Sequence, residues 1–171
     1  IDWVVEQSLV GMLEHNPDIN RVLTVNLKAL KHDKRQVFTQ IRQIKSYAAQ
    51  HYDLVIDAQG LLKSAIVAKL LGRHTIGFSK NSIREKFAAR FYTQTVAIDY
   101  ADNVIWRNLK VLCEPLGIHV TAEDITHKKP FLFYPSMSDT PIAQLMAQGR
   151  KNIVLVLGAS RPNKIYPAER F

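Results

Sequence analysis

The chain has 171 residues, of which 47% are hydrophobic and 22% charged, and its formal net charge at pH 7 is +8. This composition is typical of a folded globular domain and excludes a mainly disordered chain, which would be poorer in apolar residues. No apolar run approaches the roughly 18 residues of a membrane-spanning helix, and no signal peptide opens the sequence, so we expect a cytoplasmic protein. The one cysteine, Cys113, excludes a disulfide framework and is expected to be a buried structural thiol.

Strand patterns alternate with helix patterns along the first part of the chain. Apolar runs predict strands at 1–5, 21–26 and 52–60, the last of them buried on both faces. A short helix at 8–16 should begin with Ser8 as its cap, and an amphipathic helix at 33–52 should begin at Asp33. Helical spacing predicts the inward face of this second helix, which consists of Val37, Phe38, Ile41, Ile44, Ala48 and Tyr52.

The same alternation continues after residue 60. Helices are predicted at 63–72, 82–92 and 101–118, and strands at 74–78 and 93–98. Gly72 and Gly117 should close the first and last of these helices. The inward face of the last helix should be made of four apolar residues, Val104, Leu109, Val111 and Leu112. Repeated strand–helix alternation is typical of a Rossmann-like parallel sheet, so we predict an α/β fold.

Hydrophobic periodicity lapses between residues 119 and 138, where prolines appear. A short helix (141–149) and a new apolar strand (152–158) follow. We therefore predict two domains, residues 1–138 and residues 139–171, the second barely begun. Because the chain opens within a strand pattern and closes at the start of a helix pattern, we expect it to be a fragment of a larger protein.

Basic residues are concentrated in the middle of the chain. Between residues 61 and 110 there are 9 Lys and Arg against 3 Asp and Glu, whereas the first 60 residues carry 7 of each sign. This excess predicts a surface for phosphates or other anions, and a merely solvated basic face is the alternative.

The stretch LVIDAQGLLKS (54–64) ends a strand in residues suited to ligand binding, since open α/β sheets bind ligands beyond the carboxyl ends of their strands. Asp57 and Gln59 lie at that end, and Gly60 permits a tight turn. Lys63 and Ser64 then open a helix whose free N–H groups favour an anion. The alternative is that Asp57 is a buried cap for a neighbouring loop. The stretch has neither the dinucleotide-binding fingerprint nor a P-loop.

The stretch VLVLGASRPNKIYP (154–167) also runs from a strand into a small-residue turn. Backbone N–H groups in such a turn can approach a phosphate, Ser160 offers a hydroxyl and Lys164 a positive charge. An ordinary loop with an exposed lysine is the alternative. The six histidines lack metal-ligand spacing, so no metal site is predicted.

Four stretches in this order, IDWVVE, YDLVIDAQGLLKSA, IREKFAARFY and GASRPNKIYPAERF, resemble the lipopolysaccharide heptosyltransferases of glycosyltransferase family 9. The similarity covers nearly the whole chain, and the DAQGLLKSA version looks like the heptosyltransferase I group. The resemblance implies the GT-B architecture, in which an N-terminal acceptor-binding domain faces a C-terminal nucleotide-sugar-binding domain. It also implies an inverting transfer of L-glycero-D-manno-heptose from ADP-heptose to Kdo of Kdo2-lipid A, with no cofactor and no required metal. Such an enzyme would be cytoplasmic and peripheral to the inner membrane of a Gram-negative bacterium.

The resemblance carries roles to matching positions of this sequence. It implies acceptor binding by Arg84, Lys28 and Lys31, and donor-phosphate binding by Lys164 and Ser160. Three further residues match the motif as structural or supporting positions, Asp57, Gln59 and Lys63. The family's first strand and its general-base Asp precede the first residue of this chain, so we expect no catalytic residue here and no activity of these 171 residues alone.

Other interpretations stay open at this point. One is a different family 9 transferase, such as heptosyltransferase II. Outside that class, the chain could be a protein-interaction domain or a basic Rossmann-like module that binds nucleic acid, which predicts aromatic residues interleaved among exposed basic ones. Phe87, Phe91 and Tyr92 instead have helical spacing, which favours packing in the core and no nucleic-acid partner.

Overall fold

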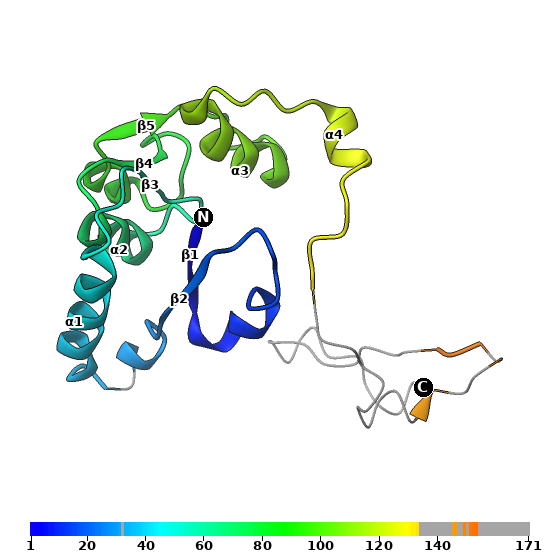
Figure 1. The fold of residues 1–171 in the computed structure, drawn as a ribbon. Helices are drawn as coiled ribbons and strands as arrows, with labels where there is room; N and C mark the ends of the chain where they lie inside the picture. Colours follow the sequence, from blue (N-terminus) through cyan, green and yellow to red (C-terminus); the bar gives the residue numbers. More distant parts are fainter. Residues whose placement is uncertain (32, 134–144, 147–148, 150, 154–171) are drawn as a thin grey trace, which may run out of the picture. The chain divides into compact units, whose positions relative to one another are not determined.

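The computed structural model describes residues 1–31, 33–133, 145–146, 149 and 151–153 (Figure 1). The chain divides into two compact units, Ile1–Phe133 and Tyr134–Phe171. Most of the second unit lies outside the described residues, including Ser160, Lys164 and most of the helix and strand predicted at 141–149 and 152–158. The domain roles assigned from the sequence therefore stay predictions.

The first unit contains two parallel sheets. β1 (Asp2–Glu6) pairs with β2 (Arg21–Val25), with Asp2 opposite Arg21. β3 (Val55–Ile56), β4 (Thr75–Phe78) and β5 (Gln94–Val96) form the second sheet in that order. All of these pairings are parallel, which confirms the predicted α/β class.

Helices connect these strands (Figure 1). The α-helices are α1 (Gln36–Ala48), α2 (Leu62–Leu71), α3 (Val104–Cys113) and α4 (Ala122–Thr126). The 3-10 helices are η1 (Gln7–Met12), η2 (Ala29–Lys31), η3 (Lys86–Phe91) and η4 (Glu114–Leu116). In the part of the chain that the structure describes, none of these helices combines the length and apolar character needed to span a bilayer.

Two of the predicted helices are wrong in type. The segments predicted as α-helices at 8–16 and 82–92 form the shorter 3-10 helices η1 and η3. η1 has no buried residue, so no apolar face holds it as an α-helix, and Glu6 rather than Ser8 occupies its N-cap position. The aromatic residues of the second segment are only partly in the core, because Tyr92 is buried whereas Phe87 is exposed.

Two groups of buried side chains form the core. One surrounds β4 and contains Phe78, Tyr92, Val96 and Val111. The other contains Val25, Ile44, Val67 and Leu71, and partly buried residues of β1 and β3 pack against it. This second group therefore connects the two sheets through α1 and α2, which lie side by side.

A polar cluster reinforces the same connection. The Asp2 carboxylate accepts hydrogen bonds from Arg21 Nε at 3.0 Å and from the Tyr52 hydroxyl at 2.7 Å. The hydrogen bond with Arg21 is the main reason that the pKa of Asp2 lies well below its usual range. Since Tyr52 leads into β3, this cluster ties the start of β1 to the second sheet.

Three predicted burial assignments are wrong. β3 is half-buried because, among the described residues, it pairs only with β4. Phe38 on α1 is 80% exposed, and Gln40 is buried in its stead. The Gln40 side chain accepts a hydrogen bond from the Asn26 backbone N–H at 2.8 Å, which turns this face of α1 toward the end of β2. Val104 is 60% exposed because it begins α3.

Candidate functional site

A cavity of about 370 Å³ lies where the strands of the second sheet end. Residues 58–61, which follow β3, form one side of it, and Ile83 and Arg84, which follow β4, form another. Tyr100 and the α3 residues Arg107 and Asn108 complete it. Parallel sheets bind ligands beyond the carboxyl ends of their strands, so this cavity is the candidate site.

Asp57 directly follows β3 and is a buried carboxylate with four hydrogen-bond donors. Its Oδ1 accepts from the backbone N–H groups of Gln59 at 2.8 Å and Gly60 at 3.2 Å. Its Oδ2 accepts from Ser64 Oγ and from the Tyr92 hydroxyl, both at 2.7 Å. Burial, followed by this hydrogen bond, raises the pKa of Tyr92 far above its usual range. The geometry is that of the structural alternative, in which Asp57 organises the loop.

Gly60 makes the tight turn that was predicted from the sequence. Its φ is +67°, a backbone conformation that residues other than glycine rarely adopt. A Cβ atom there would lie 2.8 Å from Cγ2 of Ile83, so the turn also packs closely against the cavity wall. The Gln59 side chain is exposed beside this turn.

The start of α2 was expected to offer free N–H groups to an anion, and two of the N–H groups there are paired with side chains of the protein. The Leu62 N–H donates to the Glu85 carboxylate at 2.7 Å, and the Leu61 N–H donates to Ser64 Oγ at 3.1 Å. A carboxylate of the protein itself therefore accepts from one of the N–H groups that could otherwise face an anion. Lys63 lies in the first turn of α2 and is exposed to solvent.

Arg84 lies next to Glu85 and lines the cavity. Its side chain is exposed, and it forms no hydrogen bond or ion pair with any residue that the structure describes. A guanidinium group can form two parallel hydrogen bonds to one carboxylate or phosphate. Arg84 is therefore available for an anionic ligand at the mouth of this cavity.

Arg107 also lines the cavity, although it was not among the site residues predicted from the sequence. Its Nη2 donates to the Ser82 carbonyl at 2.6 Å, and its guanidinium lies 4.5 Å from the centre of the Tyr100 ring. Its Nε is buried without a hydrogen-bond partner in the described part of the chain. Arg107 thus holds the loop that carries Arg84 and adds positive charge to the cavity. An arginine within the otherwise apolar face of α3 is the signal that could have identified it.

The remaining predicted acceptor residues lie at the first sheet. Lys28 follows β2, its backbone N–H donates to the Glu6 carboxylate, and its Nζ donates to Ser8 Oγ, both at 3.2 Å. Lys28 therefore stands at the carboxyl ends of β1 and β2 and does not line the cavity. Lys31 ends η2, but its side chain is outside the described part of the structure.

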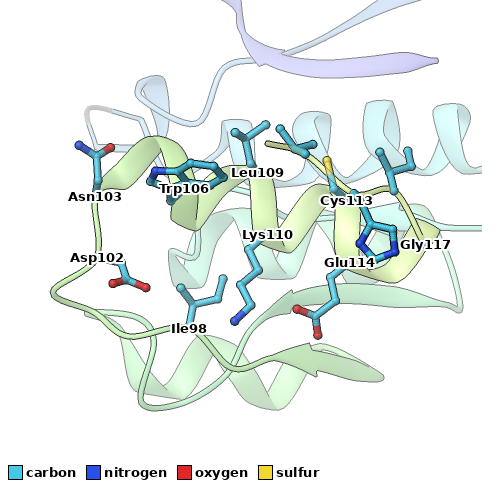
Figure 2. A pocket seen from close by; sticks show the side chains of 12 residues that line it. Ile98, Asp102, Asn103, Trp106, Leu109, Lys110, Cys113, Glu114 and Gly117 are labelled. Carbon is cyan, nitrogen blue, oxygen red and sulfur yellow. The ribbon is translucent and has the colours of Figure 1, made fainter. Parts of the chain in front are cut away.

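A second cavity, of about 520 Å³, lies along α3 (Figure 2). Trp106, Leu109 and Cys113 project from one flank of the helix, and Lys110 and Glu114 from the next (Figure 2). Cys113 is only half-buried, so its expected full burial is wrong. None of the residues singled out from the sequence as ligand-binding lines this cavity, and the described residues include no group of His, Cys, Asp and Glu that could hold a metal ion.

Comparison with known proteins gives a consistent result. A family model described as glycosyltransferase family 9 (heptosyltransferase) matches residues 40–171. The chain is 34% identical to lipopolysaccharide heptosyltransferase 1 of Campylobacter coli, over 98% of this chain and 48% of that protein. It is 26% identical to lipopolysaccharide heptosyltransferase 1 of Escherichia coli K12, over 99% of this chain and 52% of that protein. The chain thus spans about half the length of these relatives.

A solved structure supports the same relationship. The structure is similar to Escherichia coli heptosyltransferase WaaC with ADP-2-deoxy-2-fluoro heptose, with a TM-score of 0.65 and 26% identity, over 71% of this chain and 40% of that one. This likeness confirms the Rossmann-like fold of a GT-B glycosyltransferase. Because the family model covers most of the chain and a relative matches almost all of it, the chain belongs to glycosyltransferase family 9.

Proposed function

We propose that the full-length protein transfers L-glycero-D-manno-heptose, with inversion, from ADP-heptose to Kdo of Kdo2-lipid A. The observation that carries this proposal is the 34% identity to a lipopolysaccharide heptosyltransferase 1 over 98% of the chain. The similar solved structures are of Escherichia coli heptosyltransferase WaaC with ADP and with ADP-2-deoxy-2-fluoro heptose, which supports an ADP-linked heptose as the donor. Such a protein would act at the cytoplasmic face of the inner membrane.

In this proposal Arg84 binds an anionic group of the acceptor. Kdo carries a carboxylate, and lipid A carries phosphates, so both offer the oxygen pairs that a guanidinium fork recognises. Arg107 supports this role, because it holds the Ser82 carbonyl two residues before Arg84. Lys28 would contribute a single charge at the carboxyl ends of β1 and β2.

Donor binding is assigned to Lys164 and Ser160 by resemblance alone, since both lie outside the described residues. An ammonium group beside the donor's phosphates would stabilise the negative charge that grows on ADP as it departs. Because this charge is larger in the transition state than in bound ADP-heptose, Lys164 should increase kcat more than it lowers KM.

The test is release of ADP from ADP-heptose by the full-length protein, with and without Kdo2-lipid A. Arg84→Ala should lower kcat/KM for the acceptor by about 10- to 100-fold, the range expected for losing one charged hydrogen-bonding group. Lys164→Ala should mainly lower kcat. Lys110→Ala is the control, because this exposed lysine lies on α3 beside the second cavity.

Two results would contradict the assignment. If Arg84→Ala behaved like the Lys110→Ala control, the acceptor would not contact this cavity. If ADP release required an acceptor that already carries heptose, the protein would be a heptosyltransferase II.

A further inference from the structure

We infer that the exposed face of α1 docks on an anionic lipid surface. The inference starts from Phe38, which is 80% exposed and is the most exposed Phe, Tyr or Trp side chain among the residues that the structure describes. The buried face of α1 is already filled by Gln40 and Ile44. Phe38 therefore contributes nothing to the core, and its ring presents apolar area to water.

Positive charges lie on the same face of the helix. Arg35, Arg42 and Lys45 are exposed, and with Phe38 they are spaced by three, four and three residues, which places all four on one stripe. We call these four residues the α1 stripe. None of its three basic side chains forms a hydrogen bond or ion pair with another described residue.

Acidic groups do not neutralise the α1 stripe. The helix from Gln36 to Ala48 contains no Asp or Glu. The nearest acid along the chain is Asp33, whose carboxylate accepts hydrogen bonds from the Arg35 backbone N–H at 2.9 Å and from the Gln36 side chain at 3.5 Å. The stripe therefore presents three cations around one aromatic ring.

This combination fits the interface of a bilayer. Basic residues are attracted to anionic headgroups, with a contribution equivalent to about fivefold in binding for each residue. An aromatic ring between them can enter the boundary between headgroups and acyl chains, as in interfacial amphipathic helices. Nucleic-acid surfaces instead combine basic residues with several stacking aromatics, and the α1 stripe has one.

The choice of a lipid partner also rests on the proposed function, whose acceptor is a lipid. α1 begins shortly after the segment that contains Lys28 and Lys31, the residues to which the resemblance assigns acceptor binding. Docking through the α1 stripe would hold that segment beside the membrane that contains the acceptor. The diffusion of enzyme to substrate would then take place along a surface rather than in solution.

Vesicle binding tests the inference without any heptose transfer. The protein is sedimented with vesicles of phosphatidylcholine alone or of phosphatidylcholine mixed with phosphatidylglycerol, at low and high salt. We expect binding only to the mixed vesicles, with affinity falling as salt increases. Phe38→Ser should weaken binding by about tenfold, because it removes the apolar side chain that enters the interface. The double variant Arg42→Gln/Lys45→Gln should weaken it by about 25-fold, since two cations are lost.

Two variants serve as matched controls. Phe87→Ser removes another exposed ring, 56% exposed on η3, and Lys110→Gln removes an exposed charge on α3. Both should bind vesicles like the parent protein. Thermal unfolding should be unchanged in the α1 variants, because the replaced side chains make no core contact.

Several outcomes would overturn the inference. Failure to bind the mixed vesicles would do so, and so would equal losses in the control variants. Tighter, α1-dependent binding to duplex DNA or RNA would assign the stripe to nucleic acid instead. A protein that binds vesicles through α1 but releases no ADP would refute the proposed function alone, and an active heptosyltransferase that ignores vesicles would refute the docking surface alone.

Discussion

Asp57→Ala should be a strongly destabilising change at the candidate site. The carboxylate of Asp57 is 6% exposed and accepts four hydrogen bonds, from Gln59, Gly60, Ser64 and Tyr92. The Gly60 N–H and the Tyr92 hydroxyl are themselves buried, so removal of the carboxylate leaves two buried donors without a partner. Each such donor costs about 1–3 kcal/mol, so the two together predict a loss of about 2–6 kcal/mol in the free energy of unfolding.

A second substitution separates this explanation from simple loss of packing. Tyr92→Phe alone should cost about 1–1.5 kcal/mol, because it removes one donor and leaves Asp57 with three. In the double variant Asp57→Ala/Tyr92→Phe, the buried Tyr92 hydroxyl is no longer present to be left unpaired. Its loss should therefore be smaller than the sum of the two single losses, with a coupling of about 1–2 kcal/mol.

Urea unfolding followed by circular dichroism measures these differences, with an unchanged m-value showing that the unfolded state is the same. Asp99→Ala is the control, because Asp99 is exposed and its carboxylate accepts one backbone hydrogen bond, from Ala101 at 2.9 Å. This control should cost less than about 1 kcal/mol. The argument that Asp57 organises the loop would be refuted if Asp57→Ala lost no more stability than the Asp99→Ala control. It would also be refuted if the losses of the two single variants were additive in the double variant.

Three other substitutions test separate features. Burial raises the pKa of Tyr52 to about 12 in the folded protein. In the unfolded chain this hydroxyl has the ordinary tyrosine pKa of about 10, so it loses its proton at a lower pH than in the folded state. Stability should therefore fall between about pH 10 and pH 12 in urea unfolding, and the fall should be smaller in Tyr52→Phe, in which Tyr92, whose pKa is also raised by burial, still contributes. Gly77→Ala should cost about 1–3 kcal/mol, because its Cβ would lie 2.4 Å from the Tyr92 ring, whereas Gly11→Ala, with 4.0 Å to its nearest neighbour, should not. Arg107→Lys should raise the acceptor KM of the full-length protein with little change in kcat, since it loosens the loop that carries Arg84; an equal loss in kcat would contradict this role.

Local patterns predicted the strands and main helices well. The apolar runs that form β1, β2, β4 and β5 are short and bounded by turn residues, so their strand conformation can be predicted from the neighbouring residues in the sequence. The rotation of α1 was not predictable in this way. Periodicity counts Phe38 as apolar and therefore inward, but the buried position belongs to Gln40, because its amide satisfies the Asn26 N–H at the end of β2. That preference depends on a partner 14 residues away in the chain.

The candidate site shows the same division between local and distant information. The segment 57–64 was located because ligands bind beyond the carboxyl ends of parallel strands. Recognising that position needs only a strand pattern that ends in a polar residue and a glycine. It did not show that Glu85, 23 residues later, would occupy the start of α2, or that Tyr92 would donate to Asp57. Both partners are brought there by the fold. Arg107 was missed because a single arginine in an amphipathic helix is usually a surface residue.

The charges around the cavity explain why its ligand should be an anion. None of the described residues that line the cavity is acidic, and the acids adjacent to them in the chain already accept hydrogen bonds from the protein. Asp57 accepts four, Glu85 accepts the Leu62 N–H and Asp99 accepts the Ala101 N–H. The arginines are not balanced in this way, because Arg84 has no ion-pair partner among the described residues and Arg107 contacts a neutral carbonyl and aromatic rings. The local field is therefore positive, and a carboxylate or phosphate from outside the chain is the group that would neutralise it. An acidic side chain in the cavity would reduce this field, so Asn108→Asp, at another residue that lines the cavity, should weaken acceptor binding.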